Sequence, residues 1–178
     1  EFRARKAYIA EGEELVKLKK IVLGANGSMN AKLVGRPAIE IAQEAGFNVP
    51  ADTKLIIGEA TSTEISEPLA HEKLFPLLSM YKAEDFDDAV DKADELVQGG
   101  GIGHTAGIYI DVVNNQEKLN EFERRMKACR ILVNTPSAQG GIGDIYNFKL
   151  SPSLTLGCGS WGGNSVSENV GPKLDHFN

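Results

Sequence analysis

The chain has 178 residues, a net charge of −6 and a hydrophobic fraction of 42%, so it is long and apolar enough to bury a core. Acidic and basic residues are interspersed and no basic stripe carries aromatic residues, which argues against a nucleic-acid partner. No apolar run reaches the length of a membrane span, and the two cysteines lie far apart. We therefore expect a cytoplasmic chain that forms one domain over residues 1–178.

Apolar residues at helical spacing alternate with short apolar runs along the chain. Pro37 and Gly46 fit the first position and the left-handed end of one helix, and Gly99–Gly101 are expected to stop another. This alternation predicts an α/β fold with a mostly parallel sheet and helices on both faces. The predicted helices cover residues 11–23, 37–45, 84–98 and 115–128, and the predicted strands cover 54–58, 75–81, 106–110, 130–134 and 153–156.

The stretch from Asn134 to Pro172 is rich in Gly, Ser and Asn and contains the single Trp of the chain. Glycine lets a backbone approach a ligand or another chain closely. A buried irregular loop braced by Tyr146, Phe148 and Trp161 would have the same composition. The pattern alone leaves both interpretations open.

The same stretch carries a family resemblance. Residues 135–173, TPSAQGGIGDIYNFKLSPSLTLGCGSWGGNSVSENVGPK, resemble the end of the aldehyde dehydrogenase half of the bifunctional aldehyde-alcohol dehydrogenases. The resemblance begins near Tyr8, and the final LDHFN departs from it. It implies an aldehyde-dehydrogenase-like catalytic domain that interconverts acetyl-CoA and acetaldehyde with NAD(H) through an enzyme thioester. It also implies that the nucleophilic cysteine and the nucleotide-binding domain precede residue 1, so we expect the isolated chain to be inactive.

The segment EKLFP, which begins at Glu72, stands where aldehyde dehydrogenases carry Glu-x-Phe-Gly-Pro. By its position alone, Glu72 is a solvated carboxylate in a loop before a strand. The resemblance implies instead that Glu72 binds the nicotinamide ribose and that Leu74, in place of the aromatic residue, lies near the nicotinamide. Leu156 is expected to help hold the cofactor. Phe75 replaces the glycine of the family and departs from its pattern.

His104 lies in the glycine-rich run GGGIGHTAG, which we expect to form a short turn between a helix and a strand. A lone histidine in such a run is often structural or exposed, but imidazole ordinarily titrates near neutrality and can transfer protons there. The resemblance implies that His104 lies beside the catalytic thiol, where it assists proton transfer or positions the thioester and the CoA sulfur. No second ligand stands at metal-binding spacing, so we expect no metal site.

Cys129 continues the apolar face of the helix predicted over 115–128, and we expect it to be a small buried residue. Cys158 lies among glycines and is interpreted as structural, because no base stands near it in the sequence and the nucleophile of the family maps upstream. GCGSWG at 157–162 matches the dinucleotide fingerprint. We reject it as a nucleotide site, because no helix, second strand and acidic residue can follow it. Asn134 ends a strand and is a further candidate for facing the site.

Two other functions remain open at this level. The chain could be a stand-alone thiol enzyme that uses Cys158 and His104, or a non-catalytic assembly module whose interface is Asn134–Pro172. The resemblance implies acyl-CoA and short aldehydes as substrates and coenzyme A as co-substrate. It also implies a homo-oligomer, which forms filaments in the bifunctional enzymes.

Overall fold

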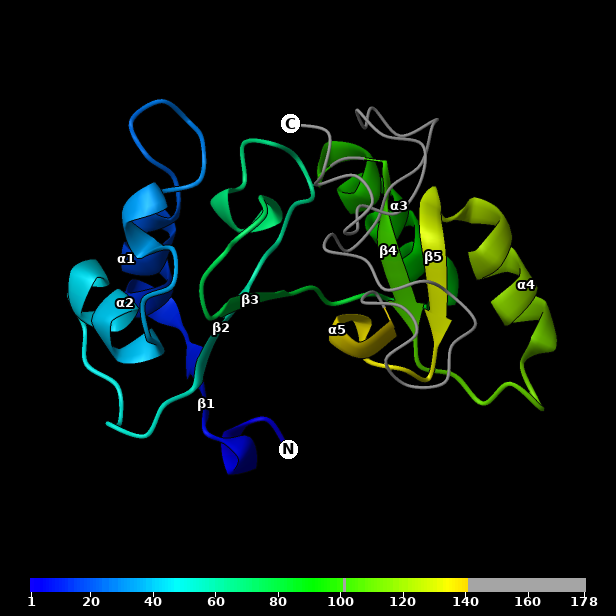
Figure 1. Cartoon of the computed structure of the whole chain (residues 1–178), viewed down its shortest axis with the longest axis horizontal. Coiled ribbons are helices and arrows are strands. Elements are labelled where there is room, and N and C mark those ends of the chain that lie inside the picture. The colour runs from blue at the N-terminus through cyan, green and yellow to red at the C-terminus, as the bar shows by residue number, and fades with distance from the viewer. Residues whose placement is uncertain (101, 141–178) are drawn as a thin grey trace, which may run out of the picture. The chain divides into compact units, whose positions relative to one another are not determined.

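The computed structural model describes residues 1–100 and 102–140 and divides the chain into two compact units (Figure 1). Unit 1 comprises Glu1–Ala83 and unit 2 comprises Glu84–Asn178. The single domain expected from the sequence stays a prediction. The strand predicted over 153–156 lies outside the described residues.

Unit 1 is an α/β unit with a parallel sheet. Its elements are η1 (Arg3–Arg5), β1 (Ala7–Ala10), α1 (Gly12–Val22), η2 (Ala31–Leu33), α2 (Ala38–Ala45), β2 (Leu55–Glu59), η3 (Pro68–Ala70) and β3 (Leu77–Met80). The three strands pair in the order β1-β2-β3, with Tyr8 opposite Ile56 and Ile57 opposite Leu78. Parallel neighbours need a crossover connection, and α1 and α2, which pack against each other, provide the one between β1 and β2 (Figure 1).

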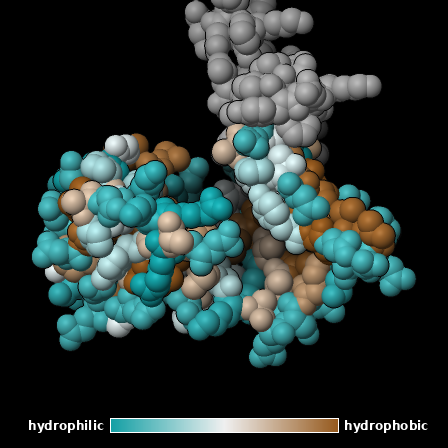
Figure 2. All heavy atoms as spheres, turned by 90° about the horizontal axis from the view of Figure 1, so that it is seen from below, coloured by the Kyte–Doolittle hydropathy of each residue, from teal (hydrophilic) through white to brown (hydrophobic). Residues whose placement is uncertain are grey.

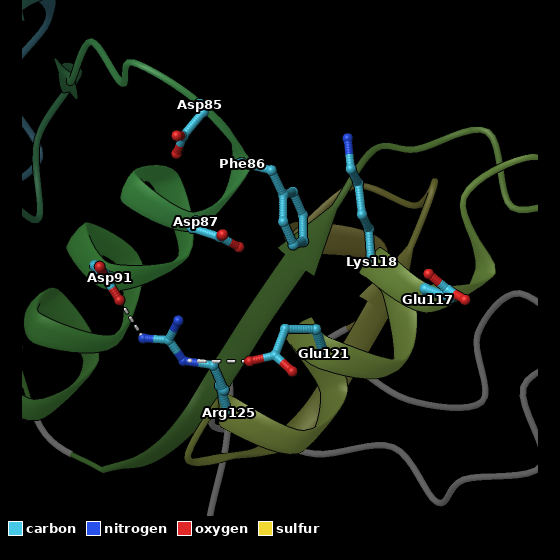
Figure 3. A pocket seen from close by; sticks show the side chains of 8 residues that line it. All are labelled: Asp85, Phe86, Asp87, Asp91, Glu117, Lys118, Glu121 and Arg125. Carbon is cyan, nitrogen blue, oxygen red and sulfur yellow. Dashed lines mark hydrogen bonds and ion pairs between the residues drawn. The ribbon is translucent and has the colours of Figure 1, made fainter.

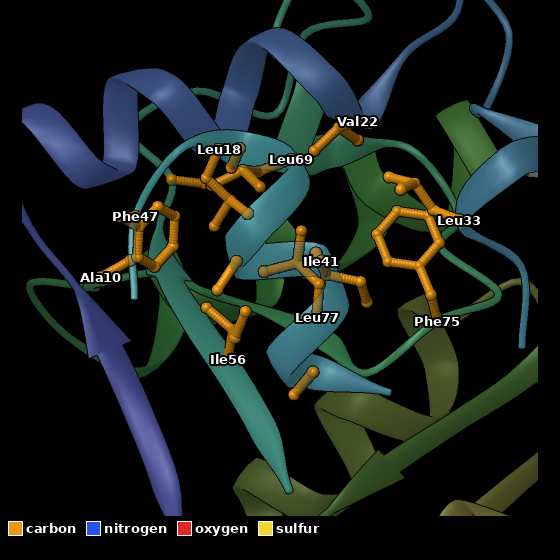
Figure 4. Packing of buried hydrophobic residues seen from close by; sticks show 14 residues of the cluster. Ala10, Leu18, Val22, Leu33, Ile41, Phe47, Ile56, Leu69, Phe75 and Leu77 are labelled. Atoms are coloured by element: carbon orange, nitrogen blue, oxygen red, sulfur yellow. The ribbon is translucent and has the colours of Figure 1, made fainter. Parts of the chain in front are cut away.

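The core of unit 1 brings together side chains from the sheet and from both α-helices (Figure 4). Leu18 of α1, Ile41 of α2 and Ile56 of β2 are fully buried there. Phe75 lies beside Leu33 at one end of the cluster, so the segment before β3 belongs to the core. Burial of a large apolar side chain stabilises a fold by about 1.5–3 kcal/mol, and Phe75 thereby ties the loop before β3 to the framework of the unit.

Unit 2 contains a two-stranded parallel sheet with helices on both faces (Figure 1). Its described elements are α3 (Phe86–Gly100), β4 (Gly103–Ile108), α4 (Gln116–Arg125), β5 (Ala128–Val133) and α5 (Ser137–Gly140). Ala106 of β4 packs in one cluster with Val90 of α3 and Phe122 of α4. Side chains alternate between the two faces of a strand, and Leu132 of β5 points to the face opposite to this cluster, where it lies against Gly140 of α5. α5 therefore covers the opposite face of the sheet from α3 and α4.

The start of α3 is a reciprocal cap made of acidic residues. The Asp85 carboxylate accepts a hydrogen bond from the Asp88 N–H at 2.9 Å, and the Asp88 carboxylate accepts one from the Glu84 N–H at 2.8 Å. These bonds satisfy donors at the helix start and place negative charge at the positive end of its dipole.

The predicted α/β class and the parallel strands are confirmed, but within the described residues the strands do not form the one sheet that we expected. The four strands expected over 54–58, 75–81, 106–110 and 130–134 belong to two hydrogen-bonded sheets, and β1 joins the first of them. Periodicity identifies segments that suit a sheet, but it contains no information about which strands become neighbours. The four residues of β1 are also too few for an apolar pattern to stand out.

Several predicted ends of elements are also wrong. Gly99 and Gly100 are the last two residues of α3, so the helix ends within the predicted glycine run but two residues later than expected. β4 begins at Gly103 instead of 106. Pro37 is the residue before α2 and not its first residue, whereas Gly46 ends α2 in the left-handed conformation, as predicted.

Apolar side chains reach the surface of both units, and Figure 2 shows a group of them on unit 2. Those of unit 2 include Tyr109, Val112 and Val113, the last of which is 84% exposed. Asp111 stabilises the turn that carries them by accepting hydrogen bonds from the N–H groups of Val113 and Asn114. Within residues 1–100 and 102–140, no helix is long and apolar enough to cross a membrane.

Candidate functional site

The two predicted cofactor contacts of unit 1 lie in the loop between η3 and β3. The side chains of Glu72 and Leu74 are exposed, whereas Lys73 is half-buried and Phe75 is only 8% exposed. Inward and outward side chains thus alternate, and the inward ones anchor the loop. The loop presents a carboxylate, which can accept two hydrogen bonds from a diol, and two residues later an apolar side chain that can pack against a ring.

The backbone of Leu74 is held from both sides by the region around η2. Its N–H donates to the Met29 sulfur at 3.3 Å, and its carbonyl accepts from the Gly35 N–H at 3.3 Å. Leu74 itself is 53% exposed, a large fraction for a leucine whose main chain is bonded on both sides. The exposed side chain of Leu74 therefore extends from a backbone that is held in place.

Lys73 is a residue of this loop that the sequence analysis did not single out. Its ammonium donates to the carbonyl oxygens of Leu69 and His71, both at 2.6 Å. The Ser79 hydroxyl of β3 donates to the same Leu69 carbonyl at 2.5 Å. Burial lowers the pKa of Lys73 to about 8, and the nearby Glu67 carboxylate opposes that shift. In sequence Lys73 resembles any surface lysine, because its acceptors are backbone groups that converge only after η3 has formed.

Glu67 connects the loop to α1 through a buried ion pair. Its carboxylate accepts the Leu69 N–H at 3.0 Å, which caps η3, and it pairs with the Lys19 ammonium at 2.6 Å. Glu67 is 8% exposed, and a buried charge is tolerated where it is paired and hydrogen-bonded. The position of η3 is thereby coupled to that of α1.

The structure places His104 on a strand and not on a turn, which corrects the prediction. His104 is the second residue of β4 and its side chain is exposed. Side-chain alternation puts it on the same side of β4 as Ala106 and Ile108, which pack with α3 and α4. It lies at the amino-terminal end of the strand, whereas ligands of parallel sheets commonly bind beyond the carboxyl ends. The glycines before it misled the prediction, because the strand begins within them.

The prediction that Cys129 is buried was also wrong. α4 ends at Arg125, the chain enters β5 at Ala128, and Cys129 is exposed on that strand. Helical spacing therefore does not apply to this residue. Asn134 follows β5 with φ at 53°, and its side-chain amide exchanges two hydrogen bonds, each 2.9 Å long, with the backbone of Ile110. These bonds join the ends of β4 and β5, which is a structural role.

A concave surface of about 780 Å³ lies between α3 and α4 (Figure 3). Arg125 of α4 forms an ion pair with Asp91 of α3 at 2.5 Å and lies 4.0 Å from Glu121 on its own helix. The Lys118 ammonium lies 5.5 Å from the centre of the Phe86 ring, which is a cation–π arrangement. These contacts hold the two helices together. Neither this surface nor an adjoining cavity of about 390 Å³ is lined by His104.

The remaining predicted site residues are placed as follows. Glu72 and Leu74 lie together on one loop of unit 1, and His104 lies in unit 2. Leu156, Cys158 and the rejected fingerprint at 157–162 lie outside the described residues. Within the described part of the chain, no group of three or more His, Cys, Asp or Glu side chains is arranged to hold a metal ion.

Sequence comparison finds close relatives over nearly the whole chain. The bifunctional aldehyde-alcohol dehydrogenase of Escherichia coli is 58% identical over 172 residues, which is 97% of this chain and 19% of that protein. The aldehyde-alcohol dehydrogenase of Clostridium acetobutylicum is 53% identical over 173 residues, which is 97% of this chain and 20% of that protein. The chain thus spans about a fifth of the length of these curated relatives. No protein-family model matches it.

Solved structures agree with these relatives. An acetylating aldehyde dehydrogenase from Geobacillus thermoglucosidasius is 38% identical and superposes with a TM-score of 0.84, over 94% of this chain and 36% of that one. A probable aldehyde dehydrogenase from Listeria monocytogenes is 40% identical with a TM-score of 0.85, over 97% of this chain and 37% of that one. Sequence and fold together confirm the predicted resemblance: the chain is homologous to one segment of the aldehyde-alcohol dehydrogenases and acetylating aldehyde dehydrogenases.

Proposed function

We propose that this chain is the part of a CoA-acylating aldehyde dehydrogenase that helps to hold the nicotinamide cofactor and to move a proton during catalysis. The complete enzyme would interconvert acetyl-CoA and acetaldehyde with NAD(H). The observation that carries the proposal is the exposed pair Glu72 and Leu74 on an anchored loop, in a chain 58% identical to a bifunctional aldehyde-alcohol dehydrogenase.

The residues of the loop fit a nicotinamide nucleotide. The Glu72 carboxylate is exposed and can accept hydrogen bonds from both hydroxyls of a ribose. Leu74 can cover one face of a nicotinamide ring and exclude water there, and Leu156 would add to this apolar contact. The bound cofactor supplies or accepts the hydride. The loop of this chain would orient it toward an acyl group held on a cysteine outside the chain.

His104 is proposed as the group that moves the proton. A protonated imidazole can donate a proton to an alkoxide oxygen or a departing thiolate, and a neutral imidazole can accept one from a thiol. Its exposed position on β4 leaves the ring accessible to a substrate. CoA as co-substrate is supported by a propionaldehyde dehydrogenase of Rhodopseudomonas palustris with bound propionyl-CoA, which is 25% identical with a TM-score of 0.64.

Three further expectations belong to the same proposal. The complete protein would act in the cytoplasm on acyl-CoA and short aldehydes. It would form a homo-oligomer, and filaments if it also carries an alcohol dehydrogenase half. An engineered glycolyl-CoA reductase with bound NADP⁺, which is 27% identical with a TM-score of 0.64, supports a nicotinamide nucleotide as the cofactor.

The test is the variant Glu72→Gln in the complete enzyme. It removes charge-assisted hydrogen bonds to the ribose, which are worth about 1.5–3 kcal/mol each, so NADH binding or hydride transfer should weaken about tenfold to a hundredfold. The matched control is Glu64→Gln, another exposed glutamate of unit 1, which should leave the kinetics unchanged. If Glu72→Gln leaves the kinetics with both cofactor forms unchanged, the assignment is wrong.

A further inference from the structure

We propose that Lys73 is a positioning residue: its side chain closes the backbone around Glu72 and so sets the direction of the Glu72 carboxylate. This inference rests on the proposed function, because it concerns the cofactor contact assigned to Glu72. Lys73 itself would not touch the cofactor. Its effect would pass through the neighbouring residue.

Lys73 holds the peptide group before Glu72 through its bond to His71. The carbonyl of His71 belongs to the peptide group that joins His71 to Glu72, and Lys73 donates to it at 2.6 Å. A planar peptide group that is held at its oxygen cannot rotate freely. The bond therefore restrains the backbone on the amino side of Glu72, while the buried Phe75 restrains it on the carboxyl side.

Lys73 also connects this peptide group to Leu69, which is firmly held in unit 1. Its other bond goes to the Leu69 carbonyl, which also accepts from Ser79 of β3. The Leu69 side chain is 1% exposed, and the Leu69 N–H is bonded to the Glu67 carboxylate. Leu69 is thus held at its N–H, its carbonyl and its side chain, so a link to it is a link to the framework of unit 1.

The protonation of Lys73 depends on the groups near it. Glu67, which pairs with Lys19, acts on Lys73 directly, and His71 and Glu72 are its neighbours in the chain. Burial, and to a lesser extent Glu67, raises the pKa of Tyr81, which follows β3. Burial, opposed by Glu67, brings the pKa of Lys73 to about 8. Above that pH the amine is neutral. Its hydrogen bonds to the two carbonyls then lose their charge-assisted strength, which is roughly half of the interaction.

The KM for NADH should therefore depend on pH in a way that a purely structural lysine would not cause. In the wild-type complete enzyme, the KM for NADH should rise as pH passes from 7 to 9, while the variant Lys73→Met should have a raised KM and no such pH dependence. Loss of this restraint should raise the KM for NADH by about two- to tenfold, which corresponds to about 0.4–1.4 kcal/mol. The kcat measured at saturating NADH should change less than the KM.

Two companion variants sharpen the test. Lys73→Arg keeps a charge that does not titrate in this range, so its KM should stay within about threefold of wild type and should not rise with pH. Lys20→Met removes an exposed lysine of α1 and should behave as wild type. The wild-type pH profile and Lys73→Arg keep the inference testable if Lys73→Met does not fold.

A double-mutant cycle decides whether Lys73 acts through Glu72. If it does, Lys73→Met should have little further effect on the KM for NADH once Glu72→Gln is present. An additive effect, an unchanged KM in Lys73→Met, or a pH dependence that persists in Lys73→Met would each overturn the inference. These failures are distinct from failure of the proposed function, for which Glu72→Gln alone would leave NADH binding unchanged.

Discussion

The loop before β3 in unit 1 and the strand β4 in unit 2 carry the two proposed site regions, and they are held in different ways. The loop is irregular, yet Lys73, Phe75 and the backbone of Leu74 bind it to surrounding groups. His104 lies on a regular strand whose backbone is paired with β5, and its side chain is exposed. In the loop, contacts made by neighbouring residues position the exposed side chain. On β4, the backbone hydrogen bonds to β5 position it.

This difference predicts how each region responds to change. An exposed residue such as Glu72 can be misdirected by alteration of a residue that does not touch a ligand, because its direction depends on side-chain contacts in the loop. The direction of His104 follows from the alternation of β4 and the pairing with β5, which a single side-chain substitution alters little. Substitutions in the neighbourhood of His104 should therefore matter less than substitution of His104 itself.

The largest expected effect is that of His104→Asn in the complete enzyme. Asparagine keeps hydrogen-bonding capacity but cannot transfer a proton in the same way, so the rate constant for acyl-CoA reduction should fall about 10²–10⁴-fold. Pre-steady-state kinetics would measure this rate constant. The control is His71→Asn, because the His71 ring is bonded to the Ile65 carbonyl at 2.7 Å and its loss should leave the rate constant unchanged. A shift in melting temperature with an unchanged rate constant would remove His104 from the site.

An intermediate effect is expected for Gly58→Ala, which tests the packing beneath the loop of unit 1. An added Cβ at this position of β2 would lie 3.0 Å from side-chain carbons of both Leu15 and Leu69. Overpacking of this kind destabilises a protein by about 1–3 kcal/mol, and denaturant unfolding would measure it. The matched control is Gly99→Ala, where an added Cβ meets nothing within 4 Å and alanine favours the helix. Equal stability of the two variants would contradict the described packing.

The smallest expected effect is a pH dependence of stability that comes from Lys73. Its pKa in the folded protein is about 8, below the ordinary value of 10.5, so between these values the unfolded chain binds more protons than the folded one. Stability should therefore rise with pH across this window relative to Lys73→Met, by less than about 1.4 kcal/mol per pH unit. Unfolding at several pH values would measure the difference between the two proteins. A difference that falls with rising pH would show that the ammonium form is favoured by folding.

The sequence alone predicted the α/β class, the approximate positions of four helices, and the loop that carries Glu72 before a strand. These features follow from local spacing of apolar residues and from a motif of five residues, both of which are properties of neighbouring positions. Boundaries were less accurate at the start of β4 and at Cys129, because local spacing does not show where pairing with a neighbouring strand begins.

What only the tertiary structure decided is which groups meet. The pairing of β1 with β2, the exposed strand position of His104 and the bonds from Lys73 to two carbonyls all depend on segments that approach each other after folding. The Glu67–Lys19 pair joins residues 48 positions apart. Such contacts have no period and no motif in the sequence, because a backbone carbonyl is the same acceptor at every residue and only the fold selects the one that a lysine can reach.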